Sequence, residues 1–370
     1  MTLDPTTTKL EREFKHARPL IGCRFDPAGR FLFASAEDNS IQRFDLLTGS
    51  KVAFIGHTSW VRGMAFVGTP GNAEVEAWSR RQTTLEAVAG FASATLSAPK
   101  AATFMLVSAD YHGNIIWWDG AADAPKPIRV VKAHIGWVRA VAVSPDGKTL
   151  ASCGNDNAVK LWNAADSKPI RTLEGHASHV YNVAFHPDGT RLASQELKGI
   201  VKDWDLKTGT CTRDLDVKVL HKYDPTFMAD IGGARGMAFK ADGSTVALCG
   251  ITNVSNAFAG VGNPAVVLID WADGKAKLLK TKDAFQGTAW GVAFHPSGAV
   301  IAAGGGGQGR VWFWKGDDLT SVHTLTVPAN ARDLAISPTG DRFAVAGANG
   351  TAYVYNFSGT APAAVPPPKK

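Results

Sequence analysis

The sequence is short of cysteine and of long apolar runs. The cysteines lie far apart and none belongs to a CxxC pair: Cys23, Cys153, Cys211 and Cys249. Thiols used this sparsely are typical of a reduced protein, so we expect a cytoplasmic location and no disulfide. No uncharged apolar stretch reaches the roughly 18 residues that span a bilayer, and the N-terminal stretch up to Leu20 contains no run of signal-peptide length. The sequence therefore favours neither secretion nor a membrane span.

Motifs of the common enzyme classes are also missing. The sequence has no GxSxG or HExxH motif, and no serine or cysteine has an obvious base beside it. The glycine-rich run 304–310 leads into a strand-like run and lacks the Lys-Ser/Thr pair of a phosphate loop, so it indicates a hairpin. We therefore expect no enzyme, no cofactor and no metal site. Carboxylates that only the fold brings together stay open as an alternative.

Glycine, by contrast, is abundant and recurs at regular places. A four-residue turn of the type Ser-Pro-Asp-Gly ends at Gly29, Gly147, Gly189, Gly243, Gly298 and Gly340, with a degraded copy at Gly71. Proline fixes φ for the second turn position, and glycine tolerates the positive φ of the last. Three of the steps between neighbouring copies are 42 residues long, and the longer steps read as one period plus an insertion.

The unit that repeats is clearest over residues 134–162. Alternating apolar residues predict strands over 137–143, 148–153 and 159–162, with turns between them. Three strands cannot close a core alone, so the units must pack on one another. A period of about 40–45 residues with four strands per unit indicates a β-propeller blade.

The residues around these turns resemble the tryptophan-aspartate (WD) repeat family, with its G-protein β-subunit-like repeats. Literal matches are Gly56-His57, Gly175-His176, Trp118-Asp119 and Trp204-Asp205, and near matches are Ala133-His134, Trp162-Asn163 and Phe44-Asp45. The resemblance covers about residues 9–357. It implies an all-β fold: a seven-bladed β-propeller of four-stranded antiparallel blades, closed by an N-terminal strand (9–15) that pairs with 352–357. Members of the family mostly serve as binding platforms for unrelated partners.

On this basis residues 1–358 form one propeller domain. Blade two carries an insertion at 72–102, which could be a partner-docking helix, although an ordinary excursion folded on the blade is preferred. Long loops are expected at 216–233 and 252–264 of blade five, on the face where partners of the family usually bind. The segment 359–370 predicts a disordered, proline-rich tail.

The histidines of the repeats are expected to be structural. By the resemblance, a histidine entering each blade links a serine, an aspartate and the tryptophan of its repeat; in blade three these are His134, Ser152, Asp156 and Trp162. His57 and His176 would do the same in blades two and four, and zinc is not expected because the three histidines fall in different blades. Departures stand at His112 and Lys198, where an aspartate is expected. Blades five to seven lack the entering histidine, so we expect them to be held by apolar packing and to be looser.

One position of the repeat could carry function. The residue four places before the last apolar residue of each first strand points, in this fold, to the mouth of the central channel: Ile21, Arg62, Arg139, Tyr181, Arg235, Trp290 and Arg332. Cations at equivalent positions add their fields, and guanidinium groups suit carboxylates and phosphates. This ring predicts a site for an acidic or phosphorylated peptide, with Trp60 and Trp137 at its rim. Alternatively each arginine pairs with an acid such as Glu37 or Asp333 and merely seals the channel.

The sequence therefore predicts a non-catalytic scaffold with an acidic protein or peptide partner, as a monomer or a subunit of a larger complex. The net charge of +6 and pI near 9.1 leave a nucleic-acid-associated basic propeller as an alternative, but the basic residues are spread along the chain, which argues against it. A propeller enzyme is the third possibility.

Overall fold

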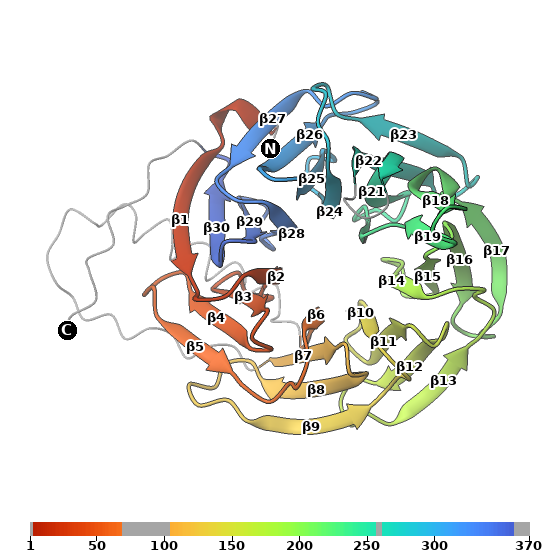
Figure 1. Cartoon of the computed structure of the whole chain (residues 1–370). Coiled ribbons are helices and arrows are strands. Elements are labelled where there is room, and N and C mark those ends of the chain that lie inside the picture. Colours follow the sequence, from red (N-terminus) through yellow and green to blue (C-terminus); the bar gives the residue numbers. More distant parts are fainter. Residues whose placement is uncertain (1–2, 69–103, 257–260, 359–370) are drawn as a thin grey trace, which may run out of the picture.

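Seven four-stranded antiparallel sheets stand around a central axis in the computed structural model (Figure 1). The structure describes residues 3–68, 104–256 and 261–358. The predicted seven-bladed β-propeller is confirmed. Across the described ranges no helix has the length and apolarity to cross a membrane.

Each blade is a meander whose first strand is innermost. Blade one contains β2 (Leu20–Phe25), β3 (Phe31–Ala36), β4 (Ile41–Asp45) and β5 (Lys51–Phe54); blade two contains β6 (Val61–Val67), β7 (Met105–Asp110), β8 (Asn114–Asp119) and β9 (Pro127–Lys132). Blade three contains β10 (Val138–Val143), β11 (Thr149–Gly154), β12 (Val159–Asn163) and β13 (Pro169–Leu173); blade four contains β14 (Val180–Phe185), β15 (Arg191–Glu196), β16 (Ile200–Asp205) and β17 (Cys211–Asp216).

The remaining blades follow the same order. Blade five contains β20 (Gly236–Phe239), β21 (Thr245–Asn256), β22 (Val261–Asp270) and β23 (Ala276–Lys280); blade six contains β24 (Thr288–Phe294), β25 (Val300–Gly305), β26 (Gly309–Trp314) and β27 (His323–Val327). Blade seven takes β28 (Ala331–Ile336), β29 (Arg342–Gly347) and β30 (Thr351–Asn356) from the end of the ring and β1 (Lys9–Lys15) from its start.

The recurring turn joins the first two strands of six blades with one geometry. In blade three, the amide of Gly147 donates to the carbonyl of Ser144 at 2.8 Å, and Gly147 has a φ of 72°. The glycine that ends each of the other five turns also has a positive φ, between 73° and 86°. This left-handed backbone favours glycine, which is why the residue marks the period in the sequence.

The first strand of the chain closes the ring. β1 pairs antiparallel with β30, from Lys9 opposite Asn356 to Lys15 opposite Thr351. Phe14 of β1 is buried and stacks on Phe44 of blade one, with ring centres 4.9 Å apart. This strand therefore leaves β30 without an open edge and joins blade seven to blade one.

The hydrophobic core is divided into seven clusters, one at each interface between neighbouring blades. Successive residues of a strand face opposite sides of the sheet, so one strand serves two clusters. In β8, for example, Trp117 packs toward blade three and Trp118 packs toward blade one, both fully buried. Blades five to seven are joined by clusters that include Trp312 and Phe343.

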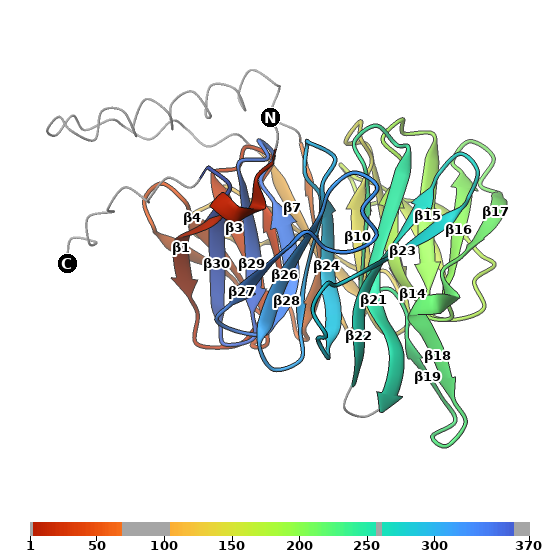
Figure 2. The same cartoon turned by 90° about the horizontal axis from the view of Figure 1, so that it is seen from above.

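The connections of blade five differ from the expected loops. The segment 216–233 contains a short 3-10 helix, η2 (Lys218–Leu220), and a hairpin of β18 (His221–Asp224) and β19 (Ala229–Gly232). The prediction of a loop over 252–264 is wrong, because β21 and β22 extend through most of this segment. Figure 2 shows both hairpins projecting from the same face of the ring. The insertion at 72–102 and the tail at 359–370 lie outside the described residues.

Candidate functional site

A β-bulge in the innermost strand of six blades sets where their ring residues point. The antiparallel register breaks around Ile21, Arg62, Arg139, Tyr181, Trp290 and Arg332, and each of these residues is skipped by the pairing. Arg235 directly precedes β20, and its amide donates to the carbonyl of Cys249 at 2.7 Å. A bulge takes a side chain out of the sheet's alternation and aims it elsewhere, here at the axis.

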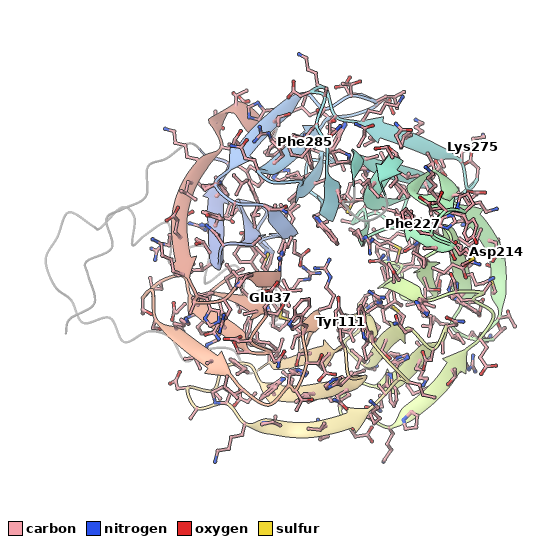
Figure 3. All side chains as sticks on the ribbon, in the orientation of Figure 1. Glu37, Tyr111, Asp214, Phe227, Lys275 and Phe285 are labelled. Carbon is pink, nitrogen blue, oxygen red and sulfur yellow. The ribbon has the colours of Figure 1, made fainter. Side chains whose placement is uncertain are left out.

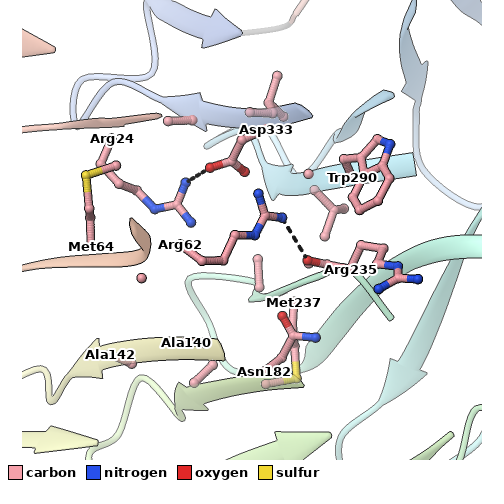
Figure 4. A pocket seen from close by; sticks show the side chains of 18 of the residues that line it. Arg24, Arg62, Met64, Ala140, Ala142, Asn182, Arg235, Met237, Trp290 and Asp333 are labelled. Atoms are coloured by element: carbon pink, nitrogen blue, oxygen red, sulfur yellow. Dashed lines mark hydrogen bonds and ion pairs between the residues drawn. The ribbon is translucent and has the colours of Figure 1, made fainter. Parts of the chain in front are cut away.

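The channel contains a cavity of about 410 Å³ lined by the innermost strands of all seven blades. Five of the seven ring residues line it: Arg62, Arg139, Tyr181, Arg235 and Trp290. Much of the remaining wall is glycine and alanine from the positions after the bulges, because neighbouring inner strands approach closely; a Cβ on Gly291, for example, would lie 2.5 Å from the amide of Leu334. The cavity is therefore a narrow space into which a few long side chains project (Figure 4).

The guanidinium group of Arg62 donates hydrogen bonds to backbone carbonyls. One terminal nitrogen donates to the carbonyls of Ile21 (2.8 Å) and Arg332 (3.3 Å), and the other donates to the carbonyl of Arg235 (3.4 Å). These carbonyls belong to blades one, seven and five, so the guanidinium of Arg62 spans the channel. Arg62 thereby ties the ring residues together from within.

Glu37 and Asp333, the two acids that could neutralise arginines of the ring, have different ion-pair partners. Arg332 forms an ion pair with Glu37, as in the sealed-channel alternative, and Arg332 does not line the cavity. Figure 3 shows Glu37 beside the central opening. Asp333 instead pairs with Arg24 at 2.6 Å and accepts from the amide of Cys23 at 3.1 Å. One ring arginine is thus neutralised and Asp333 is occupied elsewhere.

Arg24 itself was absent from the predicted ring, although it lines the cavity. It stands three residues after the bulge of β2, where every other inner strand has an alanine: Ala65, Ala142, Ala184, Ala238, Ala293 and Ala335. An arginine in a column of alanines is the signal in the sequence that could have identified it.

Arg139 and Arg235 are held by aromatic rings. The guanidinium carbon of Arg139 lies 4.3 Å from the ring centres of both Trp137 and Tyr181, and its Nε donates to Asn155 at 2.8 Å. Arg235 lies 5.4 Å from the ring centre of Tyr181 and 5.2 Å from that of Trp290. Tyr181 is therefore approached by one cation from each neighbouring blade, an arrangement that fixes both guanidinium groups without neutralising them.

The row of aromatic side chains continues outward across blade two. Tyr111 stacks on Trp137 with ring centres 4.1 Å apart and planes 4° from parallel, and it lies 6.4 Å from Trp60. Trp60 and Trp137 remain 44% and 40% exposed. Sequence reasoning missed Tyr111, which no repeat position marks; its amide donates to the carbonyl of Trp60, which places it beside the opening (Figure 3). We call the series Trp60, Tyr111, Trp137, Arg139, Tyr181, Arg235 and Trp290 the aromatic–arginine array.

The array has an excess of positive charge. Within the described ranges no acidic side chain forms an ion pair with Arg139 or Arg235, and Nε of Arg235 is buried without a hydrogen-bond partner. Burial lowers the pKa of Arg235, and the charges of Arg139 and Arg62 lower it further. Burial and the charge of Arg139 also lower the pKa of His179. The mouth can therefore attract an anion, because one would relieve this repulsion.

A second set of polar contacts stabilises three blades from within. In blade three, Ser152 Oγ lies 2.7 Å from His134 Nε2 and accepts from Trp162 Nε1 at 2.9 Å, while His134 Nδ1 lies 2.7 Å from Asp156. Burial alone would raise the pKa of Asp156, but its bonds to His134 and Lys160 lower it. Burial lowers the pKa of His134. The histidine is thus tied to the serine and the aspartate of its repeat.

Blades two and four contain the same arrangement with a different acid. His57 contacts Ser108 at 2.7 Å and Asp110 at 2.8 Å, and His176 contacts Ser194 at 2.6 Å and Glu196 at 3.0 Å. His112 and Lys198 do stand where the family has an aspartate, but Asp110 and Glu196 supply the missing carboxylates. The acid in these blades ends the second strand, two residues after the serine, whereas Asp156 lies in the following turn. Both places reach the histidine.

Comparison with known proteins supports this description. The WD domain, G-beta repeat family matches residues 125–163, 167–202, 276–315 and 319–356. The first of these segments starts with β9, the outer strand of blade two, and ends with β12, the third strand of blade three, so sequence repeats and blades are offset and interlock.

Similar segments occur in several curated proteins. The chain is 43% identical to Ribosome assembly protein 4 of Chaetomium thermophilum over 61 residues (16% of this chain, 12% of that protein). It is 45% identical to Pre-mRNA-splicing factor prp46 of Emericella nidulans over 40 residues (11% and 9%), and 29% identical to Nuclear distribution protein PAC1 of Arthroderma otae over 166 residues (43% and 30%). The matched parts span less than a third of each of these relatives.

These names correct the expected location. The cytoplasmic location predicted from the cysteines is contradicted by this comparison, because two of the relatives are named for ribosome assembly and pre-mRNA splicing. Sparse, unpaired cysteines distinguish reducing from oxidising compartments, and the nucleus is as reducing as the cytoplasm. The seven-bladed ring, the four matched segments and the His–Ser–Trp contacts within the blades show that this chain contains WD repeats, built into a β-propeller.

Proposed function

We propose that this protein is a non-catalytic interaction module that binds an acidic protein segment at the mouth of its channel. The observation that carries the proposal is the pair Arg139 and Arg235, two arginines fixed against Tyr181 with no acidic partner among the described residues. Aromatic rings and arginines of this kind form the centres of many protein interfaces, since they supply contact area and charge at low entropic cost.

The relatives support a role in an assembly. They are named for ribosome assembly, pre-mRNA splicing and nuclear distribution, and we propose that this chain too works with protein partners in a larger complex. The described residues bring together no group of three or more His, Cys, Asp or Glu side chains that could hold a metal ion. The chemistry of the mouth is that of recognition, because its side chains supply donors and rings but no nucleophile beside a base.

The test compares charge reversals inside and outside the mouth. Arg139→Glu and Arg235→Glu should abolish binding of a labelled oligoglutamate peptide and remove the same set of partners from affinity purifications. Lys148→Glu is the matched control: it makes the same change of charge on a side chain that is 83% exposed, in a turn far from the array. If all three variants keep the wild-type partners, the mouth is structural. Binding of single-stranded RNA with a steep salt dependence would instead favour the nucleic-acid alternative.

A further inference from the structure

The cavity has more cations than its own acids can neutralise. Its lining includes Arg24, Arg62, Arg139 and Arg235, whereas the one carboxylate of the lining is Asp333. Asp333 is committed to Arg24 at 2.6 Å. Three guanidinium charges therefore share a space of about 410 Å³ without a counter-charge from the described residues. Repulsion among these three like charges is relieved most by a ligand that has more than one negative charge.

We propose, building on the proposed function, that the group this mouth accepts is a phosphate monoester on a partner's side chain rather than a carboxylate. A phosphate monoester has a charge close to −2 near neutral pH and three terminal oxygens, whereas a carboxylate has one charge and two oxygens. The mouth offers donors from several directions. Arg139 uses only Nε for Asn155, and the buried Nε of Arg235 has no partner.

The shape of the channel limits how such a group can arrive. At the level of the ring, the guanidinium of Arg62 spans from blade two to carbonyls of blades five and seven (Figure 4). A peptide therefore cannot thread through the ring without breaking these bonds. A group at the end of a side chain can enter from the mouth and stop beside Arg139 and Arg235.

The rim suits the chain that would present this group. Trp60 and Trp137 are half-exposed. Together with Tyr111 they form an apolar strip that leads to Arg139. The residues flanking the phosphorylated side chain would lie on this strip, which adds contact area that free phosphate cannot use.

The experiment uses the full chain and three labelled peptide libraries that differ only at a fixed central residue: phosphoserine, glutamate or serine, flanked by random uncharged residues. Fluorescence anisotropy should show the phosphoserine library binding at least about tenfold more tightly than the glutamate library, the size of one additional hydrogen bond to a charged group. Serine peptides should bind more weakly than both.

Variants connect this preference to the two arginines. Arg139→Gln and Arg235→Gln should reduce the preference for phosphoserine to less than about threefold, and Arg139→Lys, which keeps the charge but not the fork, should lie between. Lys148→Gln should behave as wild type. Midpoints of urea unfolding for each variant show that the fold is intact, and the charge-conserving lysine variant keeps the test decisive if a glutamine variant does not fold.

The other outcomes separate the two proposals. Equal binding of phosphoserine and glutamate peptides overturns the phosphate inference but leaves the acidic-segment function standing. Failure of both libraries to bind overturns that function as well. If inorganic phosphate or free phosphoserine competes at concentrations similar to those of the peptide, the ligand of the mouth is a small phosphate compound. The proposal of a phosphate group on a partner's side chain is then refuted.

Discussion

Ser152 is the residue whose loss should most clearly reveal how the blades are held together. Its hydroxyl is fully buried and serves two neighbours at once, Trp162 Nε1 at 2.9 Å and His134 Nε2 at 2.7 Å. Ser152→Ala removes only one oxygen but leaves two buried polar nitrogens without partners. An unsatisfied buried polar group costs about 1–3 kcal/mol, so two such groups should lower the free energy of unfolding by roughly 2–6 kcal/mol.

The chain contains its own control for this change. Ser35 of β3 is equally buried, and its hydroxyl has no hydrogen-bond partner. Ser35→Ala removes the same atom from a similar strand without orphaning a neighbour, so the free energy of unfolding should stay within about 0.5 kcal/mol or rise. Both variants are compared by the urea midpoint, with the slope of the transition checked for constancy. Equal losses in the two variants would refute the account of the blade network.

Three further predictions concern pH and ring closure. Burial lowers the pKa of His134 and of His176, so below about pH 6.5 the unfolded chain binds more protons than the folded chain. The urea midpoint should therefore fall as the pH drops through that value, and it should fall less in His134→Gln. Burial raises the pKa of Asp26 to about 6, so its contribution is present at acid pH and lost as the pH rises from about 4 to 6; Asp26→Asn should remove up to about 3 kcal/mol of that decline in unfolding titrations. Deleting residues 1–15 uncovers β30 and the sites of Leu3 and Phe14, each worth about 1.5–3 kcal/mol, and should raise hydrogen exchange most in β30; unchanged protection there would contradict the role of β1.

The sequence predicts the blades well because their signal is local. The turn that ends at Gly147 needs a positive φ, and glycine, which tolerates it, ends the same turn in five further blades. The ring residues are found for a related reason: each bulge falls at the same point of its strand. The fold and the positions of the ring residues can therefore be predicted from short stretches of sequence that repeat.

The partners of the ring residues are not local, and there the predictions fail or stay open. Arg332 meets Glu37 across 295 positions of the chain, and Arg62 meets three backbone carbonyls, which leave no trace in the sequence. Whether an arginine is neutralised or left with its charge depends on contacts between blades. The acids of the histidine networks show the same limit on a smaller scale, since Asp110 and Glu196 reach their histidines from a strand rather than from the expected turn.

The seam between β1 and β30 also dictates when the ring can be complete. During synthesis six blades can form in order from hairpins of neighbouring strands, yet β1 has no partner until the seventh has been made. Thr7 meets the carbonyl of Phe357 across 350 positions, so closure is among the most distant contacts a chain of this length can make. During translation β1 therefore stays unpaired until the last strand of the seventh blade has been made.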